Sequence, residues 1–383
     1  MPITLFLSGD VMTGRGVDQI LPHPSDPRLH ERFVQSALDY VALAERVNGR
    51  IQRPVDFAYV WGVAPSLLDR EAPQVRIANL ETSVTTSDDA APKGINYRMN
   101  PRNIGVLTAV RIDCCVLANN HVLDWGRAGL IETLDTLKKA AIHVAGAGRT
   151  VAEARTPAVI EAGGGSRVVV VACGVSDAGV DPAWAATDDA PGVDHLPDLG
   201  DATVERIARS IEGVKRPGDI VVASLHWGPN WGYAISSTHR RFAHALIDRA
   251  HVDVVHGHSS HHPKAIEVYR GRPIFYGCGD LLNDYEGIAG VERFRGDLAL
   301  LYFPTLDPHT GELVRLTMIP LRIRQLRLTH ASPDDRRWLR DTMDRECHQF
   351  DHTVAVRDDA LELVWSSAGS SVRLGAPADT TAA

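Results

Sequence analysis

Five short polar segments, each directly after a β-like apolar run, constrain the fold of this chain more than any other feature. Their metal-binding side chains come in the order Asp, Glu, Asn, His, His over about 250 residues. Such a mixture of oxygen and nitrogen donors is typical of a divalent metal pair, whereas a structural zinc site prefers Cys and His at close spacing. The segments are residues 8–12, 78–81, 118–121, 224–227 and 256–262.

Short apolar runs alternate with amphipathic stretches through most of the chain, which predicts an α/β layered fold. Sites in open α/β sheets form at the carboxyl ends of strands, so we expect the five segments to meet at one edge. The predicted helices are 28–47, 130–141, 202–214 and 238–249. The predicted strands are 3–8, 75–79, 114–118, 143–145, 167–172, 220–225, 252–256, 272–277 and 298–303.

The domain organisation is predicted to be simple. Residues 1–330 form the main domain, and residues 331–374 form a C-terminal helical extension with a helix at 334–350. The small, polar residues 375–383 are expected to be a disordered tail. The glycine-rich stretch 162–166 predicts a turn at the entry of a strand, and it is not a phosphate loop because no Lys-Ser/Thr pair follows.

The bulk composition excludes several classes of protein. Of the 383 residues, 44% are hydrophobic and 23% charged, which suits an ordinary globular core. The net charge is −8 and no basic block occurs, so nucleic acid is not expected as a partner. We expect no membrane span and, since the N-terminus lacks a basic region, a cytoplasmic location. The five cysteines, without CxxC spacing, are expected to be buried free thiols.

The ordered motifs resemble those of the CapA family, named for poly-γ-glutamate capsule synthesis, within the calcineurin-like metallophosphoesterase superfamily. The resemblance covers about residues 3–305. It implies a layered β-sheet sandwich flanked by helices, with the site at the C-terminal ends of strands. The CapA-like signatures are Gly9-Asp10-Val11-Met12 with Arg15, Asn79-Leu80-Glu81, Asn119-Asn120-His121 with Asp124, and Tyr276-Gly277-Cys278-Gly279-Asp280.

The resemblance also implies one or two divalent metal ions, and the donor set allows Mn, Zn, Fe, Ca or Mg. It assigns six ligands: Asp10 to the first ion, Glu81 as the bridge, Asn120 and His226 to the second ion, and His258 and His261 one to each.

Two departures from the superfamily pattern make the expected site unequal. Met12 stands where the superfamily has a histidine, and a thioether is a poor ligand for hard divalent ions. The first metal site is therefore expected to be weak. The last block has one extra residue between its histidines, so which two of His258, His261 and His262 bind metal is left open.

The resemblance also implies catalytic residues. His121 would transfer a proton rather than bind metal, with its ring held by Asp124 three residues on. His262 is a second candidate for proton transfer. The chain contains 17 histidines, and those outside the five segments, His239 among them, are expected to be bystanders.

Five further side chains are candidates for substrate binding. An arginine can hold a carboxylate or a phosphate with two parallel hydrogen bonds, and aromatic residues on a Gly/Pro loop can form a wall for an organic or peptide substrate. Surface salt bridges and ordinary loop packing remain open as the alternatives. The candidates are Arg15, Arg98, Trp227, Trp231 and Tyr233.

Three functions compete at this stage. The chain resembles a soluble branch of the family that is linked to lasso-peptide biosynthesis, which favours epimerisation at the α-carbon of the C-terminal residue of a ribosomal lasso peptide. A metal-bound carboxylate would stabilise the enediolate, and inversion needs proton donors and acceptors on both faces. The alternatives are a metal-dependent phosphoester or amide hydrolase and a poly-γ-glutamate synthesis or binding protein.

Overall fold

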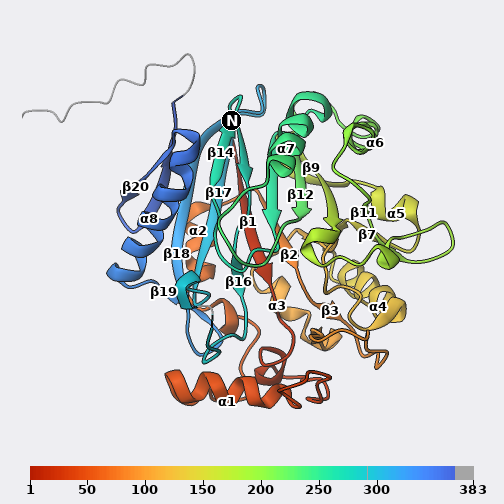
Figure 1. Cartoon of the computed structure of the whole chain (residues 1–383), viewed down its shortest axis with the longest axis vertical. Helices are drawn as coiled ribbons and strands as arrows, with labels where there is room; N and C mark the ends of the chain where they lie inside the picture. The colour runs from red at the N-terminus through yellow and green to blue at the C-terminus, as the bar shows by residue number, and fades with distance from the viewer. Residues whose placement is uncertain (291, 367–383) are drawn as a thin grey trace, which may run out of the picture.

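The computed structural model describes residues 1–290 and 292–366, and the predicted tail at 375–383 lies outside them. Two large β-sheets form the centre of the molecule, with helices around them (Figure 1). The predicted α/β fold with layered β-sheets is confirmed.

The first sheet has the strand order β20-β21-β18-β17-β1-β2-β5-β6, with β16 beside β1 and β19 beside β18. Its parallel half carries part of the site, and consists of β1 (Ile3–Val11), β2 (Val75–Leu80), β5 (Cys114–Val116), β6 (His143–Ala145) and β16 (Asp280–Leu282). Its antiparallel half consists of β17 (Leu298–Leu306), β18 (Leu313–Ile323), β19 (Leu328–His330), β20 (Thr353–Arg357) and β21 (Ala360–Val364).

The second sheet has the order β11-β9-β12-β13-β15-β14, with β8 antiparallel to β9. Its central strands are continuous apolar runs, as expected for parallel strands that are covered on both faces. The strands are β8 (Ala158–Gly163), β9 (Ser166–Val175), β11 (His195–Leu196), β12 (Ile220–His226), β13 (Val254–His258), β14 (Ile266–Tyr269) and β15 (Arg272–Phe275). Two small ribbons pair β3 (Ser83–Val84) with β4 (Arg98–Met99), and β7 (Ala147–Gly148) with β10 (Gly192–Val193).

The helices lie close to the predicted positions, with one clear difference. The predicted helix 28–47 begins only at Ala37, because Ser36 caps it by accepting a hydrogen bond from the Leu38 amide. The helices are α1 (Ala37–Asn48), α2 (Ala64–Glu71), α3 (Gly105–Thr108), α4 (Gly126–Lys139), α5 (Val151–Arg155), α6 (Asp201–Glu212), α7 (Ser237–Ala250) and α8 (Pro333–Cys347).

The C-terminal segment contains more than the predicted helix. After α8 the chain forms the hairpin β20–β21, and β21 pairs with β18, so the segment adds strands to the edge of the first sheet. Figure 1 shows this helix and hairpin in blue along one side of the molecule. Both strands are only five residues long, which is too short for their alternation to give a clear strand signal.

Other predictions can be checked directly. The stretch 162–166 forms the turn between β8 and β9, where Gly163, Gly164 and Gly165 all have positive φ. All five cysteines are buried and free. No helix within the described ranges is both long enough and apolar enough to cross a bilayer.

The two sheets meet beside the end of β1. The His256 ring in β13 lies 2.7 Å, through Nε2, from the carbonyl oxygen of Ser8 in β1. The next residue is Gly9, where a Cβ atom would lie only 1.7 Å from the carbonyl oxygen of Gly279. Only glycine permits this approach, which brings the end of β1 against the residues that enter β16.

Candidate metal centre

Strand register brings the metal-binding side chains together at one edge. Asp10 in β1 pairs with Asn79 in β2 on one side and with Asp280 in β16 on the other. In the second sheet, His226 at the end of β12 pairs with His258 at the end of β13. Asp10, Asn79, His226 and His258 stand at or near the carboxyl ends of parallel strands, which is the edge where the sequence placed the site, whereas Asp280 is the first residue of β16.

The ligand atoms form two groups that share Asp10. One group is Asp10, His226 and His258, and the other is Asp10, His261 and Asp280; within each, one ligand atom from every residue lies within 4.8 Å of the others. The Nδ1 atoms of His226 and His258 are 2.8 Å apart. His261 Nδ1 is 2.8 Å from Asp280 Oδ1. The structure thus places His258 and His261 in different groups.

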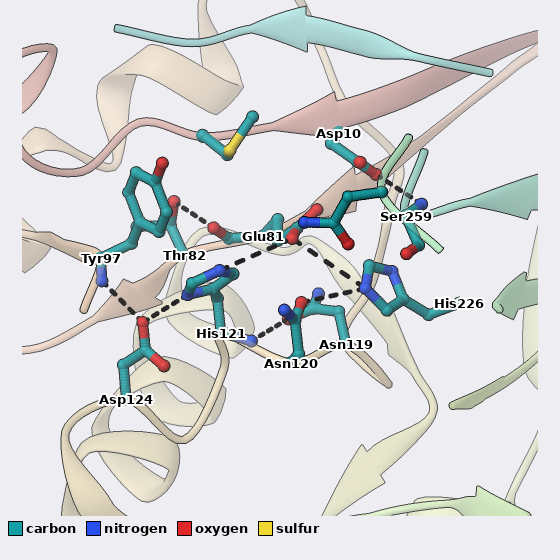
Figure 2. A network of polar contacts seen from close by, with 12 residues as sticks. Asp10, Glu81, Thr82, Tyr97, Asn119, Asn120, His121, Asp124, His226 and Ser259 are labelled. Atoms are coloured by element: carbon teal, nitrogen blue, oxygen red, sulfur yellow. Dashed lines mark hydrogen bonds and ion pairs between the residues drawn. The ribbon is translucent and has the colours of Figure 1, made fainter. Parts of the chain in front are cut away.

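Glu81 and Asn120 lie on the other side of the His226 ring. Asn120 Oδ1 is 2.9 Å from His226 Nε2, and Glu81 Oε1 is 3.9 Å from the same nitrogen (Figure 2). All six predicted ligands therefore lie in one cluster. The residue common to both groups is Asp10, whereas the family resemblance gave the bridging position to Glu81.

The carboxylates of the cluster are buried close together, so a positive charge beside them would stabilise their ionised forms. Burial, followed by the charge of Asp280, raises the pKa of Asp10 from 3.8 to about 7. Burial and the charges of Asp10 and Asp280 raise the pKa of Glu81 well above its usual value. Among the described residues, Asp10 Oδ2 has no hydrogen-bond partner, although Oδ1 accepts from Asn79 Nδ2 at 2.7 Å. An unpartnered buried carboxylate oxygen among further carboxylates fits a divalent cation.

The histidines of the cluster are suited to donate lone pairs. Burial lowers the pKa values of His226 and His258 well below the usual value, which keeps both rings neutral. At His261 burial also favours the neutral form, but the charge and hydrogen bond of Asp280 outweigh it and raise the pKa.

Asp280 is the functional residue that the sequence analysis missed. The position of the superfamily histidine is filled by Met12, which is 1% exposed and whose Sδ accepts a hydrogen bond from Tyr285 Oη at 3.5 Å. Asp280 adds an oxygen donor next to Asp10, so the group of Asp10, His261 and Asp280 has three ligands without a histidine at position 12. The available signal was the Gly279-Asp280 end of the signature at 276–280, which follows an apolar strand as the other segments do.

His121 and Asp124 form an acid–base pair that faces the cluster. His121 Nδ1 lies 2.6 Å from Asp124 Oδ2, and its Nε2 lies 3.8 Å from Glu81 Oε1 (Figure 2). Asp124 also accepts from Lys93 Nζ at 2.7 Å and from the Tyr97 amide at 2.6 Å. Burial lowers the pKa of His121 to about 4, with Asp124 opposing the shift. A neutral ring that donates through Nδ1 leaves the Nε2 lone pair directed toward the metal ligands.

The two arginines predicted to bind substrate are both engaged by groups within the protein. Arg15 is 4% exposed; its guanidinium binds both oxygens of Asp284 and also contacts Glu31 and Tyr40. Its five N–H donors are therefore largely committed to internal acceptors.

Arg98 is committed in the same way. Its Nη1 donates to the Ser87 carbonyl at 2.8 Å and to Asp88 at 2.9 Å, and the guanidinium stacks on Trp125. Both arginines are thus held by ion pairs within the protein, and their contact with substrate stays a prediction.

His262 is also displaced from its predicted role. Its Nε2 accepts from the Gly232 amide at 3.0 Å, and its Nδ1 lies 3.1 Å from the Pro263 carbonyl. The ring stacks on Phe294 at a centroid distance of 4.5 Å. Because both nitrogens are engaged, His262 holds the loop 227–233 instead of exchanging protons with a substrate.

The predicted aromatic wall divides into a core part and a rim part. Trp227 is 2% exposed, donates to the Tyr276 carbonyl at 3.2 Å and stacks on His239, so it packs in the core. Trp231 and Tyr233 remain partly exposed, and the Trp231 ring lies 5.2 Å from that of His261. Within the aromatic wall, only these two remain candidates for substrate contact.

Two layered β-sheets with Asp, Glu, Asn and His donors gathered at one edge define an α/β protein with a candidate metal-binding cluster. Within that class, the chain belongs to the bacterial capsule synthesis protein family PGA_cap, whose family model matches residues 4–285.

Relatives of known name span most of the chain. A probable polyglutamine synthesis accessory protein of Mycobacterium tuberculosis is 49% identical over 365 residues, which are 94% of this chain and 96% of that protein. The PGA biosynthesis protein CapA of Bacillus subtilis is 30% identical over 64% of this chain and 61% of its own length. A phosphatase of Mycoplasma pneumoniae covers 88% of this chain and 96% of its own at a TM-score of 0.44 and 12% identity, a likeness too weak to support any conclusion.

Proposed function

We propose that this protein is a metal-dependent amide hydrolase that cleaves a glutamate-containing peptide chain during poly-glutamate synthesis. The observation that carries the proposal is the His121–Asp124 pair, which directs Nε2 of a neutral imidazole toward Glu81, at 3.8 Å, in the ligand cluster. Membership of the PGA_cap family and the names of its relatives support glutamate polymers as the substrate class.

The residues divide the chemistry between binding and proton transfer. Divalent ions held by the two ligand groups would polarise the scissile carbonyl and lower the pKa of an attacking water. His121 would protonate the departing amine through Nε2 after taking up the proton of the attacking water. Asp124 would stabilise the imidazolium formed in between, because it accepts the Nδ1 hydrogen bond at 2.6 Å.

Epimerisation of a lasso peptide, the favoured interpretation of the sequence, has weaker support from the geometry. Inversion needs a second proton-transfer group on the opposite face of the α-carbon. His262 was the candidate for that task, and both of its nitrogens are bonded within its own loop. Hydrolysis needs only one acid–base group, which His121 supplies.

Mass spectrometry of defined oligomers tests the proposal. Metal-loaded protein is incubated with α-linked and γ-linked glutamate hexamers in H₂¹⁸O. We expect shorter products that carry one ¹⁸O in each new carboxylate, and no products after chelation or with His121→Ala. The matched control is His309→Ala, an exposed histidine away from the site, which should cleave like the wild type.

Two outcomes would overturn the proposal. Intact hexamers in the presence of bound metal would exclude hydrolysis. Deuterium at an α-carbon of an uncleaved hexamer or lasso peptide in D₂O, dependent on His121, would establish epimerisation in its place.

A further inference from the structure

A second group of charged side chains lies beside the metal centre, on the loop that follows His226. The Gly228 amide donates to Asp177 Oδ1 at 3.0 Å, and His239 Nε2 lies 2.7 Å from Asp177 Oδ2. Lys264 lies close to Gly228 as well: its Nζ is 4.0 Å from the position that a Cβ atom on Gly228 would take. We call the Gly228 amide, His239 and Lys264 the carboxylate cradle.

Lys264 lacks the partners that a buried ammonium group needs. It is 5% exposed, and its one hydrogen bond among the described residues is a 3.5 Å contact with the Ala234 carbonyl. Burial lowers the pKa of Lys264, and the charge of Asp177 opposes the shift. An ammonium group this deeply buried is stabilised by a close anion, so an anion bound beside Nζ of Lys264 would supply a partner that this group lacks among the described residues.

Asp177 is accessible and lies on a short turn. It belongs to the 3-10 turn Ser176–Ala178 at the end of β9, and its side chain is 45% exposed. By contrast, His239 is anchored in the first turn of α7, where its amide donates to Ser236. The cradle is therefore fixed, whereas the carboxylate now in it can be exchanged for one from solvent.

The turn that carries Asp177 also touches the metal centre. A Cβ atom on Gly179 would lie 3.4 Å from Asn120 Nδ2, and Gly228 is two residues after the ligand His226. A carboxylate in the cradle would thus belong to a group bound close to the metal ligands. Trp227, stacked on His239 at 4.9 Å, closes the cradle from the core side.

We propose that a side-chain or terminal carboxylate of the substrate replaces Asp177 in the carboxylate cradle and so selects an acidic residue next to the scissile bond. The inference rests on the proposed function for its substrate class. It assigns Lys264 and His239 to substrate binding and makes Asp177 an internal competitor that occupies the subsite until substrate arrives.

Binding of a γ-linked glutamate hexamer to metal-loaded His121→Ala protein tests this proposal, with affinity measured by calorimetry. In that background we expect Asp177→Ala to bind the hexamer about tenfold more tightly, because the competitor is gone. Asp181→Ala, an exposed aspartate nearby, removes the same charge and should leave affinity unchanged. Lys264→Met should bind about tenfold more weakly, with Lys215→Met as its charge-matched control.

A glutamine hexamer separates recognition of a carboxylate from nonspecific effects of the variants on peptide affinity. With its C-terminus amidated, this peptide should not respond in its binding to either cradle variant, because it then carries no carboxylate. The proposal is overturned if Asp177→Ala leaves glutamate affinity unchanged or lowers it, or if glutamine binding shifts equally. If Lys264→Met fails to fold, the change in hexamer affinity of Asp177→Ala tests the proposal by itself. If the hexamers bind as expected but are never cleaved, the carboxylate subsite is supported and the proposed hydrolysis is refuted.

Discussion

Replacing Asp10 with Asn should abolish metal binding and at the same time stabilise the metal-free protein. Asp10 is the carboxylate shared by both ligand groups, and its Oδ2 has no partner among the described residues. Asn keeps the shape of the side chain and an acceptor for the 2.7 Å hydrogen bond from Asn79. It removes the negative charge that the metal ions need and that the folded metal-free protein tolerates poorly.

The size of the effect follows from the pKa of Asp10. A rise from 3.8 to about 7 corresponds to about 4 kcal/mol of lost free energy of unfolding at neutral pH and above. The buried amide recovers most of this but costs about 1–2 kcal/mol of its own desolvation. We therefore expect a net stabilisation of about 2–3 kcal/mol, seen as a rise of a few degrees in the melting temperature of the chelated protein.

Thermal unfolding with and without Mn²⁺ or Zn²⁺ measures both effects together. The wild type should gain stability on metal addition, whereas Asp10→Asn should melt higher when chelated and gain nothing from metal. Asp219→Asn is the matched control: this buried aspartate pairs with Arg167, away from the cluster, and its hydrogen bonds outweigh burial and lower its pKa, so its loss should lower stability and leave metal affinity unchanged. A chelated Asp10→Asn protein that melts lower than the wild type, or one that binds metal normally, would refute the reasoning.

Three further predictions concern the same site. The raised pKa values of Asp10 and Glu81 give the chelated protein stability that is fully present below pH 4 to 5 and is lost as pH rises through about 7, and saturating metal should remove this loss in pH-dependent melts. His121→Ala should lower kcat at least about 100-fold with metal content unchanged, as measured by elemental analysis; loss of metal would mean that His121 is a ligand. Gly9→Ala should prevent folding or expel the metal, because its Cβ would lie 1.7 Å from the Gly279 carbonyl oxygen; normal circular dichroism with full metal content would contradict this.

The parts of the site that were predictable share a local signal. Asp10, His226 and His258 stand directly at the ends of apolar strands, and parallel strands bring their carboxyl ends to one edge whatever the order of the strands. The fold class follows from the same alternation of apolar runs and amphipathic helices. Neither inference needs any knowledge of which strand lies beside which.

The parts that were missed or stay open depend on long-range pairing. Asp280 joins the site only because β16 runs parallel to β1, about 270 residues away in sequence. Asp284, which binds the Arg15 guanidinium, is 269 residues from it in sequence. An arginine that holds a substrate and one that holds an internal aspartate have the same local sequence, so the alternatives could not be separated.

Neighbouring histidines show the same limit at short range. His261 and His262 are adjacent, yet one faces Asp280 and the other the amide of Gly232. Which way each histidine ring points depends on the path of the backbone through the loop, and the residue type alone does not predict that path. The contact of His239, expected to be a bystander, with Asp177 also depends on the three-dimensional path of the chain.

The central claim, two metal ions sharing Asp10 with Asp280 in place of the missing histidine, is tested most directly by anomalous diffraction from crystals soaked in Mn²⁺. The account predicts two anomalous peaks, one among Asp10, His226 and His258 and one among Asp10, His261 and Asp280. In Asp280→Asn crystals the second peak should weaken while the first remains. A single peak that does not contact Asp10, or a second peak unaffected by Asp280→Asn, would contradict the account.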